Sequence, residues 1–319
     1  MKSFDCLLMM ILAFGLNSGC RPEYPKRSTA QLTLRLVDDN GQPVPQAKVA
    51  VVGFHVAAEG KTDNSGCFLA TLRTVSGEVD LEADKEGFYS INRHTYLFVG
   101  ETNGQYYPWN PLVELQLHKI SKPVPMFVKK VDQRDIPAVN RAVGYDLLVG
   151  DWIEPFGTGK TADFIIEVLK RALIISNDFM RLRLTFSNPK DGLVLKRLYW
   201  RDDYDLRLAA TAPDSGYLAP WEFQACDGQH IANPGWNVLK NGDQDANFYF
   251  RIRTKTNSSG AVESAMYGKM YEAIQFGTAT YPERMPIHFL YYLNPDGTRN
   301  TEFSGSNLCA HPGDVPKGH

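Results

Sequence analysis

The sequence predicts an all-β protein with two β-sandwich domains. Short stretches in which apolar and polar residues alternate recur along the chain, as in strands that bury one face. Turns that contain glycine separate these stretches at intervals of roughly ten residues, a spacing typical of β-sandwiches. The chain has 319 residues, and this length favours two domains rather than one.

The composition is that of a folded globular protein. Hydrophobic residues make up 43% of the chain and charged residues 22%, which excludes intrinsic disorder, a collagen-like repeat and a polytopic membrane protein. Lys and Arg number 34 and Asp and Glu number 36, so the net charge is −2, and no long basic run occurs. A nucleic-acid partner is therefore not expected.

Residues 1–19 have the features of a secretory signal peptide. Lys2 precedes an apolar run from Cys6 to Leu16, which is roughly half of the ~20 residues that a membrane-spanning helix needs. Small residues then lead to Cys20. This arrangement resembles the lipobox of bacterial lipoproteins, although Asn17 stands where that pattern usually has Leu. The alternatives are a plain signal peptide that is cut nearby and an uncleaved anchor.

The resemblance implies that Cys20 is acylated and becomes the N-terminus of a lipoprotein in the bacterial cell envelope, facing the periplasm or the cell exterior. The acyl chains would hold the protein to a membrane, because each buried methylene contributes ~0.8 kcal/mol. Residues 20–28 would form the lipidated tether. Export separates the chain from nucleotides, so we expect neither a nucleotide nor another cofactor.

Export also places the remaining cysteines in an oxidising compartment. Apart from Cys6 and Cys20, the five cysteines comprise Cys67, Cys226 and Cys309. One disulfide is possible, and we predict Cys226 with Cys309 because both lie in the C-terminal half. Their spacing alone does not establish the pair.

Residues 29–120 are predicted to form the first sandwich. Leu32, Leu34 and Leu36 alternate with polar residues on one strand, and an Asp-Asp-Asn-Gly turn follows at residues 38–41. Further strands are predicted at residues 48–52, 67–70, 78–83 and 112–119.

The turn and core residues of this region resemble the carboxypeptidase regulatory-like domain, a small transthyretin-like sandwich of Ig-like fold. The residues that carry the resemblance are Val37–Val44 with Ala47 and Val49, Thr62–Gly66, and Lys85–Tyr89. The resemblance implies this sandwich fold. It also implies that the domain is an accessory module, of the kind that accompanies enzymes, transporters and surface proteins. It implies no peptidase, because a zinc carboxypeptidase needs a His-x-x-Glu pair. No histidine of the chain is followed by Glu at that spacing, and no metal site is predicted.

Residues 121–319 are predicted to form a larger sandwich after a linker at residues 121–125. Strands are predicted at residues 179–186, 248–254 and 287–293. The segment 163–175 has apolar spacing that also fits a helix, but its Ile and Val content and its neighbours favour a strand. This region resembles no characterised family.

Two motifs of the second domain suggest chemistry that their spacing does not support. Gly157–Thr161 ends like a phosphate-binding loop, but Glu154 occupies the position of the first glycine. Asp243–Asn247 opens like a calcium loop, but Phe248 stands where that loop needs Gly and Thr254 where it needs Glu. We interpret both motifs as turns.

Asp202, Asp203 and Asp205 are the strongest candidates for the paired carboxylates of a glycosidase. The neighbouring Arg201 and Arg207 favour an ion-paired surface turn instead. No Gly-x-Ser-x-Gly elbow occurs in the chain. No catalytic residue is predicted and an enzyme is not expected; the alternative is a carbohydrate-active hydrolase with its site on the C-terminal domain.

Aromatic residues provide the candidate ligand-binding site. Tyr106, Tyr107 and Trp109 lie in a segment flanked by Gly and Pro, and exposed rings on a sandwich loop can stack on sugar faces. The alternative for these residues is packing in the core or at the domain junction. The same alternative applies to Trp200, Trp221 and Trp236. The sequence therefore predicts a non-catalytic binding or structural module whose partner is a glycan or an envelope protein.

Overall fold

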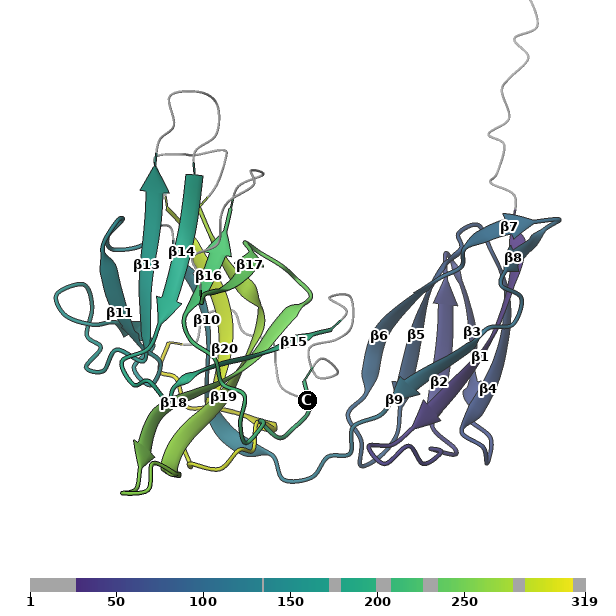
Figure 1. The fold of residues 1–319 in the computed structure, drawn as a ribbon. Helices are drawn as coiled ribbons and strands as arrows, with labels where there is room; N and C mark the ends of the chain where they lie inside the picture. The colour runs from purple at the N-terminus through teal and green to yellow at the C-terminus, as the bar shows by residue number, and fades with distance from the viewer. Residues whose placement is uncertain are drawn as a thin grey trace, which may run out of the picture.

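The computed structural model describes residues 27–133, 135–171, 179–198, 208–225, 235–277 and 285–311. Every regular element in these ranges is a β-strand, and the strands form four sheets. The sheets form two sandwiches, joined by a single connection (Figure 1). No helix in the described ranges is long and apolar enough to cross a membrane. The predicted all-β fold with two sandwiches is confirmed.

The first sandwich contains a sheet in the order β4-β1-β8-β7, in which β9 also pairs with β1, and a sheet in the order β3-β2-β5-β6. The strands of the first sheet are β1 (Ser28–Val37), β4 (Cys67–Thr74), β7 (Gly100–Thr102), β8 (Gln105–Tyr107) and β9 (Leu112–Gln116). The strands of the second are β2 (Lys48–Gly53), β3 (Val56–Lys61), β5 (Glu78–Asp84) and β6 (Ile91–Leu97).

The core of the first sandwich follows from alternation along the strands. Leu32, Leu34 and Leu36 of β1 are fully buried, whereas the residues between them are half-buried on the outer face. The three leucines share one hydrophobic cluster with Val51 of β2 and Leu81 of β5 in the facing sheet. Each such side chain contributes about 1.5–3 kcal/mol when it is fully buried.

The second sandwich contains two six-stranded sheets, in the orders β12-β11-β13-β14-β16-β17 and β15-β18-β19-β20-β10-β21. The strands of one sheet are β11 (Ala142–Asp146), β12 (Asp151–Trp152), β13 (Phe164–Arg171), β14 (Phe179–Thr185), β16 (Trp221–Gln224) and β17 (Asn237–Lys240). The strands of the other are β10 (Val124–Gln133), β15 (Gly192–Arg197), β18 (Ala246–Thr256), β19 (Val262–Phe276), β20 (Ile287–Asn294) and β21 (Phe303–Asn307).

The ambiguous segment 163–175 contains strand β13. Phe164, Ile166 and Val168 are fully buried, and the residues between them are half-buried, so the period is two rather than 3.6. The preference for a strand is confirmed. Pairing with β11 on one side and β14 on the other explains its apolar content.

The sheet that contains β19 is covered on both faces. One face lies in the core between the two sheets, with Phe248, Phe250 and Met270. The other face carries Tyr249 and Tyr267, which cluster with Leu208, Ala212 and other residues: Met126, Val128, Ala265, Tyr271 and Tyr292. The segment around residues 208–217 therefore forms a third layer over this sheet.

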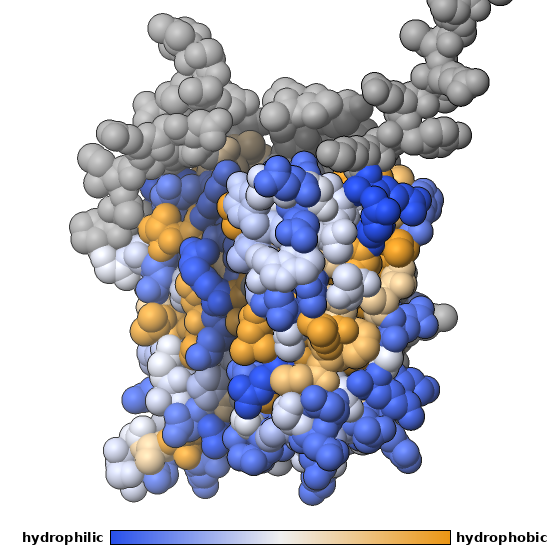
Figure 2. Space-filling model, turned by 90° about the vertical axis from the view of Figure 1, so that its right-hand side faces the viewer, coloured by the Kyte–Doolittle hydropathy of each residue, from blue (hydrophilic) through white to orange (hydrophobic). Residues whose placement is uncertain are grey.

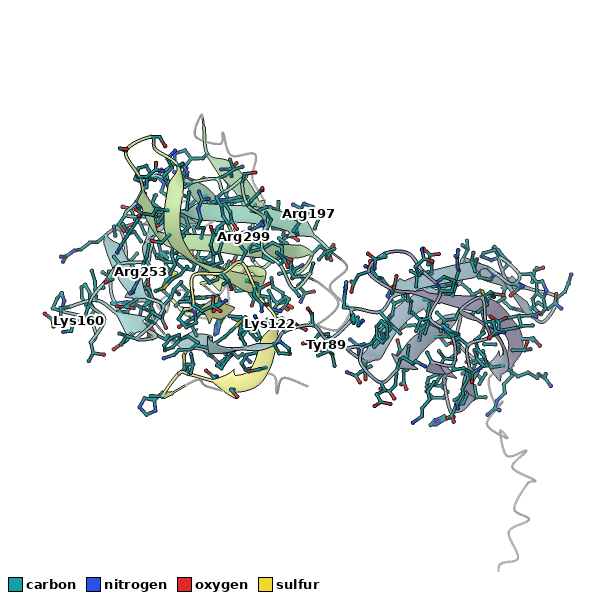
Figure 3. The ribbon with its side chains drawn as sticks, turned by 90° about the horizontal axis from the view of Figure 1, so that it is seen from below. Tyr89, Lys122, Lys160, Arg197, Arg253 and Arg299 are labelled. Carbon is teal, nitrogen blue, oxygen red and sulfur yellow. The ribbon has the colours of Figure 1, made fainter. Side chains whose placement is uncertain are left out.

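A buried carboxylate joins the two sandwiches. Glu302 is 3% exposed, and its oxygens accept hydrogen bonds from the Tyr89 hydroxyl (3.0 Å) and from the amides of Ser121 (2.8 Å) and Lys122 (2.6 Å). Tyr89 belongs to the first sandwich, and Figure 3 shows it beside Lys122 at the connection. The predicted linker at 121–125 is shorter than expected, because β10 begins at Val124.

Candidate binding surface

A change of register on β1 creates the loop that carries the candidate aromatic residues. Strands β8 and β9 both pair in parallel with β1. Thr29 pairs with Gln105, a separation of 76 positions, whereas Thr33 pairs with Leu112, a separation of 79. Three extra residues must therefore leave the edge of the sheet between β8 and β9. We call residues 107–111 the aromatic loop.

Hydrogen bonds to β1 hold the aromatic loop in place. The Asn110 amide donates to the Gln31 carbonyl (3.0 Å), and the Thr33 hydroxyl donates to Asn110 Oδ1 (2.9 Å). The Thr33 amide donates to the Pro111 carbonyl (2.9 Å). Asn110 has a φ of 51°, in the left-handed region that Asn tolerates better than most residues. The ring of Trp109 thus projects from a fixed backbone.

The structure separates the three predicted ligand-binding residues. Tyr107 is 43% exposed and Trp109 is 47% exposed. Tyr106 is buried, with its ring 5.8 Å from that of Phe98 in the core of the first sandwich. Successive side chains of β8 point to opposite faces, so Tyr106 faces inward and is not part of the surface. For Tyr106 the alternative of core packing is correct.

The Tyr107 ring lies against the backbone of β7. Gly100 pairs with Tyr107, and a Cβ added at Gly100 would lie only 2.4 Å from the Tyr107 hydroxyl oxygen. The absence of a side chain at Gly100 therefore allows the ring to approach. The hydroxyl end of the ring is thus close to β7, and the exposed part of the side chain remains available to a ligand.

An apolar row on the outer face of the sheet borders the aromatic loop. Leu69 of β4 pairs with Thr33 of β1, which pairs with Leu112 of β9, so the three side chains stand side by side. Leu69 is 56% exposed and Leu112 is 61% exposed. Figure 2 shows the side of the molecule on which β4 and β1 lie, with apolar side chains among polar ones. This row and the aromatic loop together form the candidate binding surface.

The phosphate-loop motif is a turn, as the sequence indicates. The amides of Lys160 and Thr161 donate to Asp146 Oδ2, and the Thr158 amide donates to Asp151 Oδ2 (2.8 Å). Carboxylates of the chain itself thus occupy the donors that a phosphate would need. Asp243–Asn247 is also a turn, which leads into β18, and Asp243 pairs with Arg197 (2.9 Å).

The described residues contain no candidate metal centre. No group of three or more His, Cys, Asp or Glu side chains that could hold a metal occurs among them. The acidic cluster Asp202, Asp203 and Asp205 lies outside the described residues, as do Cys20 and Trp200. Trp221 is buried in β16, and Trp236 stacks under Arg183, whose guanidinium carbon lies 5.3 Å from the ring centroid.

Cys309 is a free cysteine in this structure, and its predicted partner Cys226 lies outside the described residues. Ala225, the neighbour of Cys226, binds the Met180 carbonyl at one end of β14. Cys309 lies near Tyr291, whose hydroxyl binds the Leu147 carbonyl at the opposite end of the sandwich. The disulfide between Cys226 and Cys309 therefore stays a prediction.

A buried ionic cluster links the two sheets of the second sandwich and is not apparent from the sequence. The Arg253 guanidinium binds both oxygens of Asp163 (2.8 and 2.9 Å) and Asp146 Oδ1 (2.9 Å). The Arg253 amide donates to Asp191 (2.9 Å). Burial raises the pKa of Asp163, although Arg253 opposes the rise. Burial alone would raise the pKa of Asp146, but the backbone amides of Lys160, Thr161 and Val149 together with the Arg253 charge outweigh it and hold the pKa below the usual value. All these groups are satisfied within the protein, so we assign the cluster a structural role.

A groove of about 870 Å³ lies over the sheet β3-β2-β5-β6 of the first sandwich. Charged side chains of both signs line it: Lys48, Lys61, Glu59, Glu82 and Asp84. Asp84 accepts a hydrogen bond from the Ser90 hydroxyl (2.8 Å). The described residues that line the groove include no aromatic side chain, so the groove lacks the stacking rings of the aromatic loop.

The described residues define a two-sandwich, all-β protein with an exposed aromatic surface on its first sandwich. No protein-family model matches the chain, and no curated protein matches it. Solved structures with some similarity include the chlorocatechol 1,2-dioxygenase of Rhodococcus opacus, at 13% identity and a TM-score of 0.23, over 29% of this chain and 60% of that one. The chain thus spans about three-fifths of that dioxygenase.

Two further structures are similar over most of the chain. The major pilin subunit BcpA of Bacillus cereus has 10% identity and a TM-score of 0.22, over 86% of this chain and 99% of that one. A putative carbohydrate-binding protein of Bacteroides uniformis has 10% identity and a TM-score of 0.19, over 82% and 97%. Because these TM-scores lie below 0.5, they support no conclusion about function.

Proposed function

We propose that this protein is an exported, lipid-anchored module of the bacterial cell envelope that binds a glycan through the candidate binding surface and performs no catalysis. Its domains would be residues 29–120, the carboxypeptidase regulatory-like sandwich, and residues 121–319, with Cys20 as the lipidated residue. An envelope protein is the other class of partner for the same surface.

The observation that carries the proposal is the exposure of Tyr107 and Trp109 on a loop whose backbone is hydrogen-bonded to β1. Large exposed apolar side chains that are held by the backbone lose little conformational entropy on binding. The adjoining row of Leu69, Thr33 and Leu112 carries no charge, and its two leucines are exposed. Such a surface suits the C–H face of a sugar ring better than a charged ligand.

The first test uses the soluble chain from Arg21 to His319, mixed with purified envelope polysaccharides. We expect the chain to co-sediment with at least one polysaccharide and to leave its length unchanged. Trp109→Ala is expected to weaken this binding about 5- to 10-fold, because an aromatic contact contributes on the order of 1–1.4 kcal/mol.

Val262→Ala is the matched control, since Val262 is 41% exposed and lies on β19 of the second sandwich. Equal binding by the wild type and Trp109→Ala would remove the aromatic loop from the proposal. Retention of solubilised envelope protein in place of glycan would identify the other class of partner. Shortening of the polysaccharide would overturn the proposal in favour of a hydrolase.

A further inference from the structure

The two ends of the first sandwich differ in polarity. At the end that leads to the linker, the turns between strands are polar, at residues 38–42, 63–66 and 85–87. At the opposite end, where β1 begins, three large apolar side chains are exposed. They are Phe54 (56%), Leu97 (66%) and Val99 (78%). We call this the tether end.

Strand pairing places Phe54 at the tether end. Ser28, the first residue of β1, pairs with Thr74, the last residue of β4. The Thr74 hydroxyl oxygen accepts a hydrogen bond from the Phe54 amide (3.3 Å). The two-residue turn between β2 and β3, formed by Phe54 and His55, therefore lies next to the start of β1.

Pairing also places Leu97 and Val99 there. Leu97 pairs with Glu78, the first residue of β5, just after the turn that follows Thr74. The Val99 amide donates to the Tyr107 carbonyl (2.9 Å) at the β7–β8 hairpin, whose turn residue Gly104 accepts from the Thr29 amide (2.8 Å). Figure 1 shows β7 and β8 at the top of the first sandwich.

We propose that the tether end of the first sandwich inserts Phe54, Leu97 and Val99 into the surface of the lipid bilayer. The inference rests on the proposed lipid anchor for its location. Large apolar side chains that cluster on an exposed surface commonly mark an interaction site. Partial burial of such side chains at the membrane interface is favourable, since the hydrophobic effect scales with the apolar area removed from water.

The length of the tether identifies lipid as the occupant of this surface. Seven residues, 21–27, lie between Cys20 and Ser28. Fully extended, the chain from Cys20 to Ser28 spans at most about 29 Å, no more than the roughly 30 Å length of a ten-residue strand such as β1. With Cys20 acylated, the tether end is therefore the part of the sandwich that is held nearest to the membrane.

The charges at the tether end nearly balance. Arg27 and Arg73 are exposed there, and so are Glu78 and Glu101. His55 is also exposed, in the turn with Phe54. Attraction to anionic lipid is therefore weak, and the contact depends on apolar burial. We expect it on neutral phosphatidylcholine and expect little change between low and high salt.

The test tethers the chain from Arg21 to His319 through an N-terminal hexahistidine tag to phosphatidylcholine vesicles that contain a nickel-chelating lipid. Cys67, Cys226 and Cys309 are replaced by Ser, and an environment-sensitive fluorophore is attached at Thr102→Cys on the tether end. The comparison label is at Asn64→Cys on the linker end. On tethering, we expect a blue shift at position 102 and quenching by nitroxide lipids at least about threefold stronger than at position 64.

The variant Phe54→Ser, Leu97→Ser, Val99→Ser is expected to abolish the shift at position 102. Its matched control is Leu69→Ser, Leu112→Ser, which removes side chains of similar exposure from the side of the sandwich and should leave the shift intact. Equal signals at positions 102 and 64, or a shift that survives the triple substitution, would overturn the proposal.

This test does not depend on lipidation, because the tag supplies the tether. Lipidation is tested separately by Cys20→Ala in cells, which should abolish incorporation of labelled fatty acid and release the protein from membranes. If Cys20→Ala behaves as expected but the tethered chain shows no shift at position 102, the anchor stands and insertion of the tether end is wrong. If the shift is seen but Cys20→Ala still incorporates fatty acid, the lipidation proposal alone is wrong.

Discussion

Arg253 shows how a single residue holds the second sandwich together. It lies on β18, where the register with β19 shifts, and its φ of 53° is in the left-handed region. Its guanidinium bridges Asp146 and Asp163 in the facing sheet, while its own amide and that of Thr254 bind Asp191. Nothing in the spacing of these residues along the chain reveals that they meet.

Arg253→Met is expected to destabilise the protein by about 3–5 kcal/mol at pH 7, because the substitution leaves the buried Asp163 carboxylate without its counter-charge. The measurement is urea unfolding of the second sandwich, with Arg197→Met as the control, since Arg197 forms a more exposed pair.

The loss in free energy of unfolding that Arg253→Met causes should become smaller as the pH falls. Burial already raises the folded-state pKa of Asp163, and loss of Arg253 raises it further. Above pH 3.8, the ordinary pKa of an aspartate side chain, the folded variant then binds more protons than the unfolded chain, so its stability decreases as pH rises. A stability difference between wild type and Arg253→Met that is constant from pH 7 down to about 4.5 would contradict this explanation.

At the scale of the element, β19 packs closely against both of its neighbours, β18 and β20. An added Cβ at Gly268 would lie 2.2 Å from Phe250 Cζ and 2.3 Å from the Tyr292 carbonyl oxygen. Gly268→Ala is therefore expected to cost about 2–3 kcal/mol or to shift β18 and β20 apart. The control is Gly41→Ala, where no atom lies within 4 Å and only the positive φ of 74° opposes a side chain. Thermal unfolding of both variants checks the difference.

Many of the strands that the sequence predicts bury one face, because alternation of apolar and polar residues indicates a half-buried surface, although residues 248–254 of β18, which are covered on both faces, are predicted as well. The predicted stretches 31–37, 48–52, 67–70 and 78–83 all lie within strands of the first sandwich. Strand β19 escapes prediction because the third layer covers its outer face, so buried residues follow one another without alternation. Short strands such as β7 and β12 carry too few residues to show a period.

The same reasoning explains which parts of the candidate binding surface can be predicted from the sequence. Gly and Pro around residues 104–111 indicate a loop, and the exposure of Trp109 agrees with it. Alternation in Gln105-Tyr106-Tyr107 would have assigned Tyr106 to the core, but three residues are too few to establish a strand. The register change on β1 depends on pairing between distant segments, which one sequence does not reveal.

At the scale of the whole molecule, Glu302 holds the orientation of the second sandwich relative to the first. Its three hydrogen bonds come from the first sandwich and from the linker, and the Asn300 side chain also binds the Lys122 carbonyl (2.6 Å). The connection is thus bound from both sides. We expect the protein to behave in solution as one elongated body.

Glu302→Gln should loosen this arrangement, because an amide nitrogen would face one of the two backbone donors at residues 121 and 122. Small-angle X-ray scattering should show a broader distribution of maximum dimensions, with the unfolding of each sandwich unchanged. Glu263→Gln, which alters an exposed carboxylate, is the control. A scattering profile identical to that of the wild type would show that other contacts fix the orientation.

The register change beneath the aromatic loop has a consequence for how this surface can vary. Because β8 and β9 each keep their own pairing with β1, residues can be added or removed between them without moving a core side chain. Pro108 and Trp109, which precede the residues that bond β1, are thus the part of the loop that can vary most readily. The edge of this sheet is therefore a natural place for new ligand specificities to arise in related sequences, and for a foreign peptide to be displayed by design.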